Sequence, residues 1–145
     1  MKQKIAVIFG GHGFICHHVA RHLGNNGWWV RTVDIAPYKY GDIDFSNDYV
    51  IGDLRIPEVV SENLKPIKGQ PIDLLIQGAA DMGGMEYLAS GEADADVMHN
   101  SGLINFNTAC YATEHGVKKV AYCSSACIYP QNLQEKPDHE GLRES

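Results

Sequence analysis

The hydrophobic positions at the start of the chain change from a continuous run to a helical spacing. Five apolar residues, Ile5 to Phe9, lead directly into a glycine-rich stretch at 10–13. Beyond it, apolar residues recur four positions apart, at Ile15, Val19 and Leu23. A short apolar run is typical of a buried strand, whereas a spacing of four is typical of a helix. The pattern therefore predicts a strand, a tight turn and a helix, which the segment Gly24 to Gly27 ends.

The same succession of apolar runs and helical spacings continues along the chain. Four further strands are predicted, at Trp28 to Val33, Tyr49 to Ile51, Ile72 to Ile76 and Val117 to Cys123. One helix is expected to begin at Pro57, and a longer one to run from near Glu92 to Glu114 or His115. The stretch from Ala36 to Asp48 and the chain beyond Pro130 are expected to be loops.

Strands that alternate with helices predict an α/β fold, in which right-handed crossovers build a parallel sheet with helices on both faces. We therefore expect a Rossmann-type doubly wound parallel sheet, truncated after about five strands, in a single domain over residues 1–145. In such sheets the loops at the carboxyl ends of the strands form the ligand crevice. Those loops hold Gly10 to Gly13, Asp34, Asp53, Ala79 to Gly84, and Ser124 to Cys127.

The glycine-rich turn has the composition of a nucleotide-diphosphate site. Glycines let the backbone approach a diphosphate closely, and the unpaired N–H groups of the following helix face its charge. The spacing Gly10-x-x-Gly13-x-x-Cys16 departs from G-x-G-x-x-G, because a cysteine takes the third position. Asp34 lies about 20 residues beyond the turn, where an acidic side chain can accept the ribose hydroxyls of an adenosine. A turn that only connects strand to helix is the alternative.

Composition places the chain among soluble globular proteins. Its 145 residues suit one domain, and 44% apolar with 21% charged residues excludes a disordered or fibrous chain. The net charge of −6, without a block of Lys or Arg, argues against a surface for nucleic acid or membrane. No leader pattern or bilayer-length apolar stretch is present, so we expect a cytoplasmic protein. Its four cysteines lack C-x-x-C spacing, which favours reduced thiols.

Three motifs together resemble a known family. They are GGHGFI at 10–15, AADMGGM at 79–85 and SSACIYP at 124–130. Their order is similar to that in the extended short-chain dehydrogenase/reductases that act on nucleotide sugars, and within that group to the family of GDP-mannose 3,5-epimerases. The resemblance implies an NAD cofactor and a nucleotide-sugar substrate, and it leaves a homodimer open for the complete protein.

The resemblance also implies roles for single residues. Cofactor contacts are implied for Gly10, Gly11, His12, Gly13, Phe14, Ile15, Asp34, Asp53, Leu54, Ala79, Ala80 and Asp81. Substrate contacts are implied for Gly83, Ser125, Ala126 and Cys127. Ser125 would be the catalytic serine that bonds the sugar hydroxyl undergoing oxidation. Cys127 would be the catalytic cysteine that moves protons at the sugar carbons.

These residue types suit an epimerisation that passes through a ketone. Removal of hydride from the sugar's C4 leaves a ketone that acidifies the C–H bonds at C3 and C5. A thiol with a tuned pKa can then serve as a base that removes a proton, and return of a proton to the opposite face inverts the carbon. Members of this group also use a Tyr-x-x-x-Lys pair, which this chain lacks, since Leu133 lies four positions after Tyr129. We therefore expect an N-terminal fragment of a larger epimerase, inactive by itself.

Other functions remain compatible with the same residues. The chain could be a non-catalytic NAD-binding or regulatory module, because a fold does not fix a function. Related 4-epimerases, dehydratases and GDP-fucose synthases are further alternatives. Cys127 could be a small core residue, and Asp81 could shape its loop rather than react.

Several histidines and cysteines are interpreted without a chemical role. His12, inside the turn, is expected beside the phosphates or in solvent. His18 and His22 lie four apart but lack a third ligand, so no metal site is expected. The remaining thiols are interpreted as packing or core residues: Cys16, Cys110 and Cys123.

Overall fold

The computed structural model describes residues 2–82, 91–125 and 128–133. Its centre is a parallel sheet of five strands: β1 (Ile5–Phe9), β2 (Trp29–Asp34), β3 (Asp48–Ile51), β4 (Leu74–Gln77) and β5 (Val120–Tyr122). The described helices are α1 (Phe14–Asn25), α2 (Pro57–Leu64) and α4 (Asp94–Glu114), with a 3₁₀ turn, η2, at Gln131–Leu133.

The strand order is that of a doubly wound sheet. It runs β3-β2-β1-β4-β5, and β1 pairs with β2 on one side and with β4 on the other. Ala6 of β1 accordingly lies opposite both Val30 and Leu74. The chain therefore winds outward to β3 and then crosses to the other side of β1, which places the ligand crevice at the carboxyl end of β1. The predicted Rossmann-type sheet of about five strands is confirmed.

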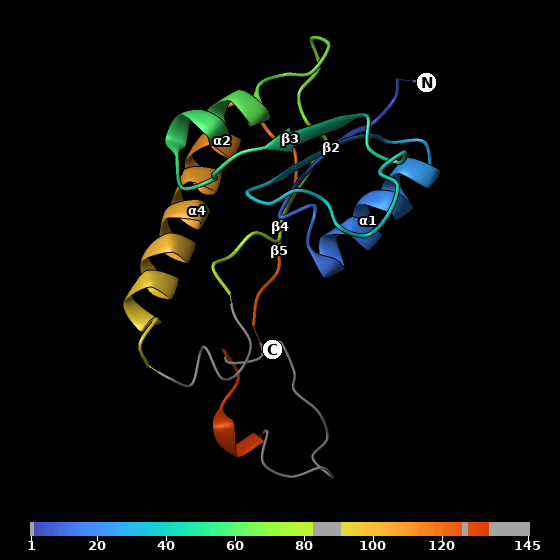
Figure 1. Ribbon diagram of the computed structural model, residues 1–145. Coiled ribbons are helices and arrows are strands. Elements are labelled where there is room, and N and C mark those ends of the chain that lie inside the picture. Colours follow the sequence, from blue (N-terminus) through green and yellow to red (C-terminus); the bar gives the residue numbers. More distant parts are fainter. Residues whose placement is uncertain (1, 83–90, 126–127, 134–145) are drawn as a thin grey trace.

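Helices cover both faces of this sheet (Figure 1). α1 packs against β1 and β2 on one face, while α2 and α4 pack together over the other. Ile8, Val30 and Phe45 belong to the apolar cluster beneath α1, and Phe9 and Val33 belong to the cluster beneath α2 and α4. Successive side chains of a strand point to opposite faces. A strand buried on both faces must therefore be apolar throughout, which explains the continuous run at the start of the chain.

The observed elements differ from their predicted bounds by at most three residues. The fifth strand is shorter than predicted because residues before it are used to end α4. Gly116 has a φ of 67°, and the Val117 N–H donates to the carbonyl of Ala112 at 2.9 Å. Asp34, which we expected just beyond the second strand, is instead its last residue.

α1 turns a different face to the sheet from the one that its apolar spacing suggests. Its buried residues are Cys16, His17 and Ala20, whereas Ile15 is 68% exposed. The His17 ring is covered because it stacks on Tyr40, with 4.5 Å between ring centroids. A thiol and a methyl group face the strands, so the helix lies close to the sheet.

Two of the cysteine interpretations are wrong. Cys16 is buried, as expected of a packing thiol, but Cys110 and Cys123 are both exposed. Cys110 lies on an exposed part of α4, and Cys123 follows β5, whose three residues are all exposed at the edge of the sheet. All three are free thiols, and Cys127 lies outside the described residues.

Two helical glycines provide a test of the packing. A Cβ on Gly24 of α1 would lie 2.4 Å from the carbonyl oxygen of Phe45, whereas a Cβ on Gly102 of α4 would meet only the ring of Phe106, at 3.8 Å. We expect Gly24→Ala to lower the free energy of unfolding by about 1–3 kcal/mol. We expect Gly102→Ala to raise it by about 0.5–1 kcal/mol, because alanine favours a helix. Urea denaturation measures both, and equal effects of the two substitutions would contradict the packing described.

Candidate cofactor-binding site

A cavity of about 370 Å³ opens at the carboxyl ends of β1, β2, β3 and β4. Eight of the predicted cofactor-binding residues line it: Gly10, Gly13, Asp34, Asp53, Leu54, Ala79, Ala80 and Asp81. The structure therefore brings together residues from four loops that are far apart in the sequence. It adds six that the sequence analysis did not single out: Ile35, Gly52, Arg55, Gly78, Asn100 and Ile104.

The glycine turn is held between the ends of β2 and β4. The N–H groups of Gly10 and Gly11 both donate to the carbonyl of Val33, at 2.8 and 3.3 Å. Gly10 has a φ of 73°, in the left-handed region, and a Cβ there would lie 2.8 Å from the Ala79 nitrogen. Only glycine fits at this position, because any other residue would be strained at this φ and its side chain would collide with the backbone of Ala79. The turn is thereby fixed against the neighbouring strands.

The start of α1 presents an open helix end to this cavity. Gly13 is its N-cap, no side chain caps the described helix, and its first turn holds no acidic residue. The first N–H groups of a helix have no intrahelical partners, and the dipole adds positive character there. Gly13 also lines the cavity. This end can therefore accept an anionic group of the size and charge of a diphosphate.

Asp34 closes the neighbouring part of the cavity from the end of β2. Its Oδ2 accepts from the backbone N–H of His12 at 3.1 Å, and its Oδ1 accepts from the N–H of Ala36 at 3.1 Å. Each carboxylate oxygen keeps further acceptor capacity. The two backbone donors fix the orientation of the carboxylate, so its remaining lone pairs can accept hydrogen bonds from hydroxyl groups of a ligand.

The His12 side chain points away from the cavity and into the protein. It is 4% exposed, its Nδ1 lies 2.6 Å from the carbonyl oxygen of Ala36, and its ring stacks on Tyr49 with 4.3 Å between centroids. Its Nε2 lies 3.3 Å from the hydroxyl of Thr32. The expectation of a solvent position is wrong, because these contacts bury the ring beneath the loop after β2. A cofactor contact through the His12 backbone stays a prediction.

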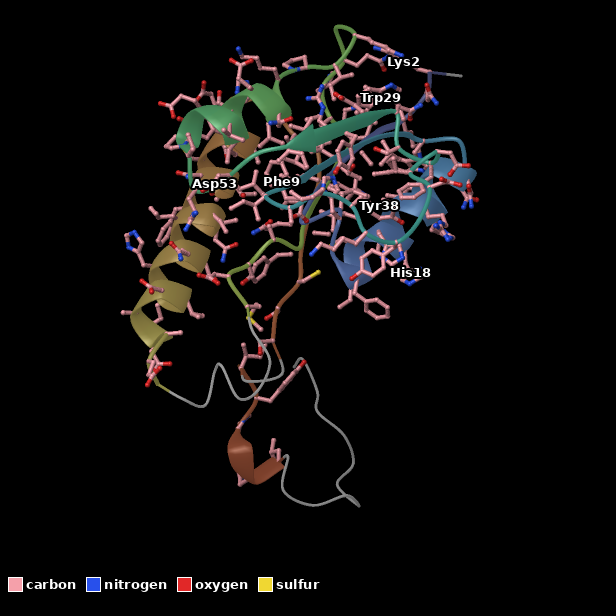
Figure 2. All side chains as sticks on the ribbon, viewed as in Figure 1. Lys2, Phe9, His18, Trp29, Tyr38 and Asp53 are labelled. Atoms are coloured by element: carbon pink, nitrogen blue, oxygen red, sulfur yellow. The ribbon has the colours of Figure 1, made fainter. Side chains whose placement is uncertain are left out.

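Asp53 and Arg55 form an ion pair at the cavity wall beyond β3. The guanidinium donates to both carboxylate oxygens, with the shortest contact at 2.7 Å. Hydrogen bonding from this guanidinium, despite the opposing effect of burial, lowers the pKa of Asp53 from its usual value. Figure 2 shows Asp53 on the side of the sheet that α2 and α4 cover, whereas His18 and Tyr38 lie on the α1 side.

α4 anchors the loops that follow β3 and β4. The Asn100 amide donates to Asp81 Oδ2 at 2.6 Å, and the Asp81 N–H donates to the Ser101 hydroxyl at 3.2 Å. The Asn107 amide donates to the carbonyl oxygens of Leu54 at 3.3 Å and Arg55 at 3.0 Å. Through these bonds Asp81 shapes its loop, which is the role that we gave above as the alternative to a catalytic one. They also fix the backbone on which Asp53 is carried.

The predicted site residues include none from α4, although the amino-acid sequence of this helix contains an indication of its role. Three asparagines occur within the predicted helix, at positions 100, 105 and 107. Asparagine is a poor helix former, so its repetition inside a helix indicates a task for the side chains. Asn105 is the third: its Oδ1 accepts from the Gln77 amide at 2.8 Å, at the end of β4.

The remaining predicted residues that the structure describes lie outside this cavity. Phe14 and Ile15 are 67% and 68% exposed on the first turn of α1, and Gly11 packs against Thr32. Ser125 is exposed after β5, and its carbonyl accepts from the Ile128 N–H at 3.3 Å. Gly83, Ala126 and Cys127 lie outside the described residues. Their roles stay predictions.

Metal ligation and membrane insertion find no support in the part of the chain that the structure describes. No group of three or more His, Cys, Asp or Glu side chains within 2–82, 91–125 and 128–133 could hold a metal ion. No helix in these ranges is long and apolar enough to cross a bilayer.

Comparison with known proteins places this geometry in a family. The profile of the NAD dependent epimerase/dehydratase family matches residues 6–145. GDP-mannose 3,5-epimerase of Arabidopsis thaliana is 36% identical over 139 residues, which are 95% of this chain and 35% of that protein. The chain thus spans about a third of the length of this curated relative.

Solved structures of other proteins have a fold similar to that of this chain. A UDP-galactose 4-epimerase superposes with a TM-score of 0.67 and 26% identity, covering 86% of this chain and 39% of the other. A short-chain dehydrogenase/reductase superfamily protein from Agrobacterium tumefaciens, solved with bound NAD, has a TM-score of 0.69 and 23% identity, covering 97% and 40%. The family profile covers nearly the whole sequence, and the chain therefore belongs to the NAD-dependent epimerase/dehydratase family.

Proposed function

We propose that the chain forms the NAD-binding part of a nucleotide-sugar epimerase of the GDP-mannose 3,5-epimerase type. The observation that carries the proposal is the position of Asp34, held by two backbone N–H groups beside the glycine turn in a cavity at the carboxyl ends of the strands. The family profile and the Arabidopsis relative support the type of reaction.

The described residues fit NAD part by part. Gly10 and Gly13, with the open start of α1, suit the diphosphate, because no side chain stands between the backbone and the cavity. Asp34 suits the adenosine ribose. Asp53 and Leu54 line the wall where the adenine edge would lie. The charge of Asp34 would repel a 2′-phosphate, which favours NAD over NADP.

When bound, NAD would supply a hydride acceptor, NAD⁺, for oxidation at C4 of the sugar and a hydride donor, NADH, for the later reduction. Ser125 would position the sugar hydroxyl through a hydrogen bond from the end of β5. Cys127 would remove or supply a proton on one face of the carbon next to the ketone, and a second group on the opposite face would complete the exchange that inverts that carbon. Removal of this proton is favourable only while the ketone is present, so the two residues must act on one bound sugar.

NAD binding tests the cofactor part of this proposal. We expect Asp34→Asn to weaken NAD⁺ binding by about tenfold or more, since each charged hydrogen bond lost contributes about 1.5–3 kcal/mol. The same variant should discriminate less against NADP⁺. Asp42→Asn, an exposed residue outside the cavity, is the matched control. Isothermal titration calorimetry measures both, and equal NAD⁺ affinities for the two variants would contradict the site.

Asn107 tests whether α4 preorganises the cavity. Asn107→Ala removes the donor to the carbonyls of Leu54 and Arg55, and we expect about fivefold weaker NAD⁺ binding from the loss of about 1 kcal/mol. Thr113→Ala, which loses only a bond within the same helix, should leave the affinity unchanged. Both variants are first compared with wild type by thermal unfolding. Unchanged affinity in a folded Asn107→Ala protein would show that the helix does not hold the site.

Deuterium exchange tests the catalytic part. The longest natural product that contains residues 1–145 is incubated with NAD⁺ and GDP-mannose in D₂O. We expect solvent deuterium at C3 and C5 of the sugar, detected by mass spectrometry and NMR, because the proton is removed and replaced there. Cys127→Ser should lose this exchange by at least about a hundredfold, within the range of general acid–base contributions, while NAD⁺ binding persists. Wild-type rates of exchange in this variant would remove Cys127 from the mechanism.

A further inference from the structure

Two cysteine sulfurs approach the same glycine behind the glycine turn. A Cβ on Gly78 would lie 2.3 Å from the Sγ of Cys16 and 3.9 Å from the Sγ of Cys123. The distance between the two sulfurs is therefore no larger than the sum of these two distances. Cys16 is 5% exposed in the first turn of α1, whereas Cys123 is an exposed residue directly after β5.

The fold explains why these residues meet. Gln77 lies opposite Tyr122 in the parallel ladder, and the Cys123 N–H donates to the Gln77 carbonyl at 3.2 Å. The next residues, Gly78 and Cys123, are therefore neighbours just beyond the ends of two adjacent strands. α1 crosses this end of the sheet and places the Cys16 thiol where a side chain at Gly78 would otherwise be. The absence of a side chain at Gly78 thus leaves room for the Cys16 sulfur, with the Cys123 sulfur at contact distance beside it.

We propose that Cys16 and Cys123 are an oxidisable thiol pair, which a peroxide converts into an intramolecular disulfide. The exposed Cys123 thiolate attacks one peroxide oxygen, the O–O bond breaks, and a sulfenic acid forms as water leaves. The Cys16 sulfur then attacks the Cys123 sulfur, the S–O bond breaks, and a second water leaves. Two thiols lose two electrons and two hydrogens in total, and one peroxide is reduced to two waters. This inference does not depend on the proposed function.

The different burial of the two thiols assigns their roles. An oxidant in solution reaches the exposed Cys123 first, and the buried Cys16 closes the bond. Burial, together with smaller contributions from the nearby Cys123 and Asp34 charges, raises the pKa of the Cys16 thiol to about 11. Because the thiolate is the nucleophile, closure should be faster at pH 9 than at pH 7.

The new bond would join the two segments that flank the cofactor site. Cys16 follows the glycine turn within α1, and Cys123 immediately precedes Ser124 and Ser125. Oxidation would therefore cross-link the diphosphate end of the site to the strand end that carries Ser125.

Disulfide mapping tests the pair directly. The reduced chain is treated with hydrogen peroxide at pH 9, free thiols are alkylated, and the protein is digested without reductant. Mass spectrometry should find the Cys16 and Cys123 peptides linked, with the loss of two hydrogens. The link should persist in Cys110→Ala, which removes another exposed thiol, and disappear in Cys123→Ala.

The wild-type map is decisive even if a variant fails to fold. Alkylated Cys16 together with singly oxidised Cys123, or a bond from either residue to Cys110 or Cys127, would overturn the proposal. The map is recorded without NAD, so a chain that binds no cofactor can still show the disulfide. Failure of the proposed function and failure of this inference are therefore distinguishable.

Discussion

The glycine turn and the end of β4 approach so closely that neither can carry a side chain at the point of contact. A Cβ on Gly10 would lie 2.8 Å from the Ala79 nitrogen, and a Cβ on Gly78 would overlap the Cys16 sulfur. Everything at the carboxyl end of the sheet depends on this approach. It fixes where α1 begins, and hence where its free N–H groups point. It also brings the His12 backbone to Asp34, which orients the carboxylate.

The sheet alone does not form the cavity, because its strands deliver loops that other elements must hold. Asn100 and Asn107 of α4 fasten the loops after β4 and β3, and the buried His12 ring fastens the loop after β2 through Ala36. Each of these side chains bonds to backbone or to a residue of the cavity wall. Because these side chains already hold the loops in place, less conformational entropy is lost when a ligand binds.

The succession of apolar runs was sufficient to predict the strands, most plainly at β1, which is buried on both faces and is apolar along its whole length. The glycine spacing and Asp34 likewise predicted the centre of the cavity, since both can be recognised from short stretches of the sequence. The contacts of α4 and the burial of His12 were not predictable in this way. They depend on residues such as Asn107 and Tyr49 that meet only when distant segments pack. The exposure of Cys123 follows from the position of β5 at the edge of the described sheet, and that position is set by strand pairing rather than by the residues next to Cys123.

The most direct test of a cofactor site at this end of the sheet is a crystal structure of the chain with NAD⁺. We expect the adenosine ribose within hydrogen-bond distance of the Asp34 carboxylate, and the diphosphate against the turn at 10–13 and the start of α1. An adenosine placed away from Asp34, or a dinucleotide bound elsewhere on the chain, would contradict it.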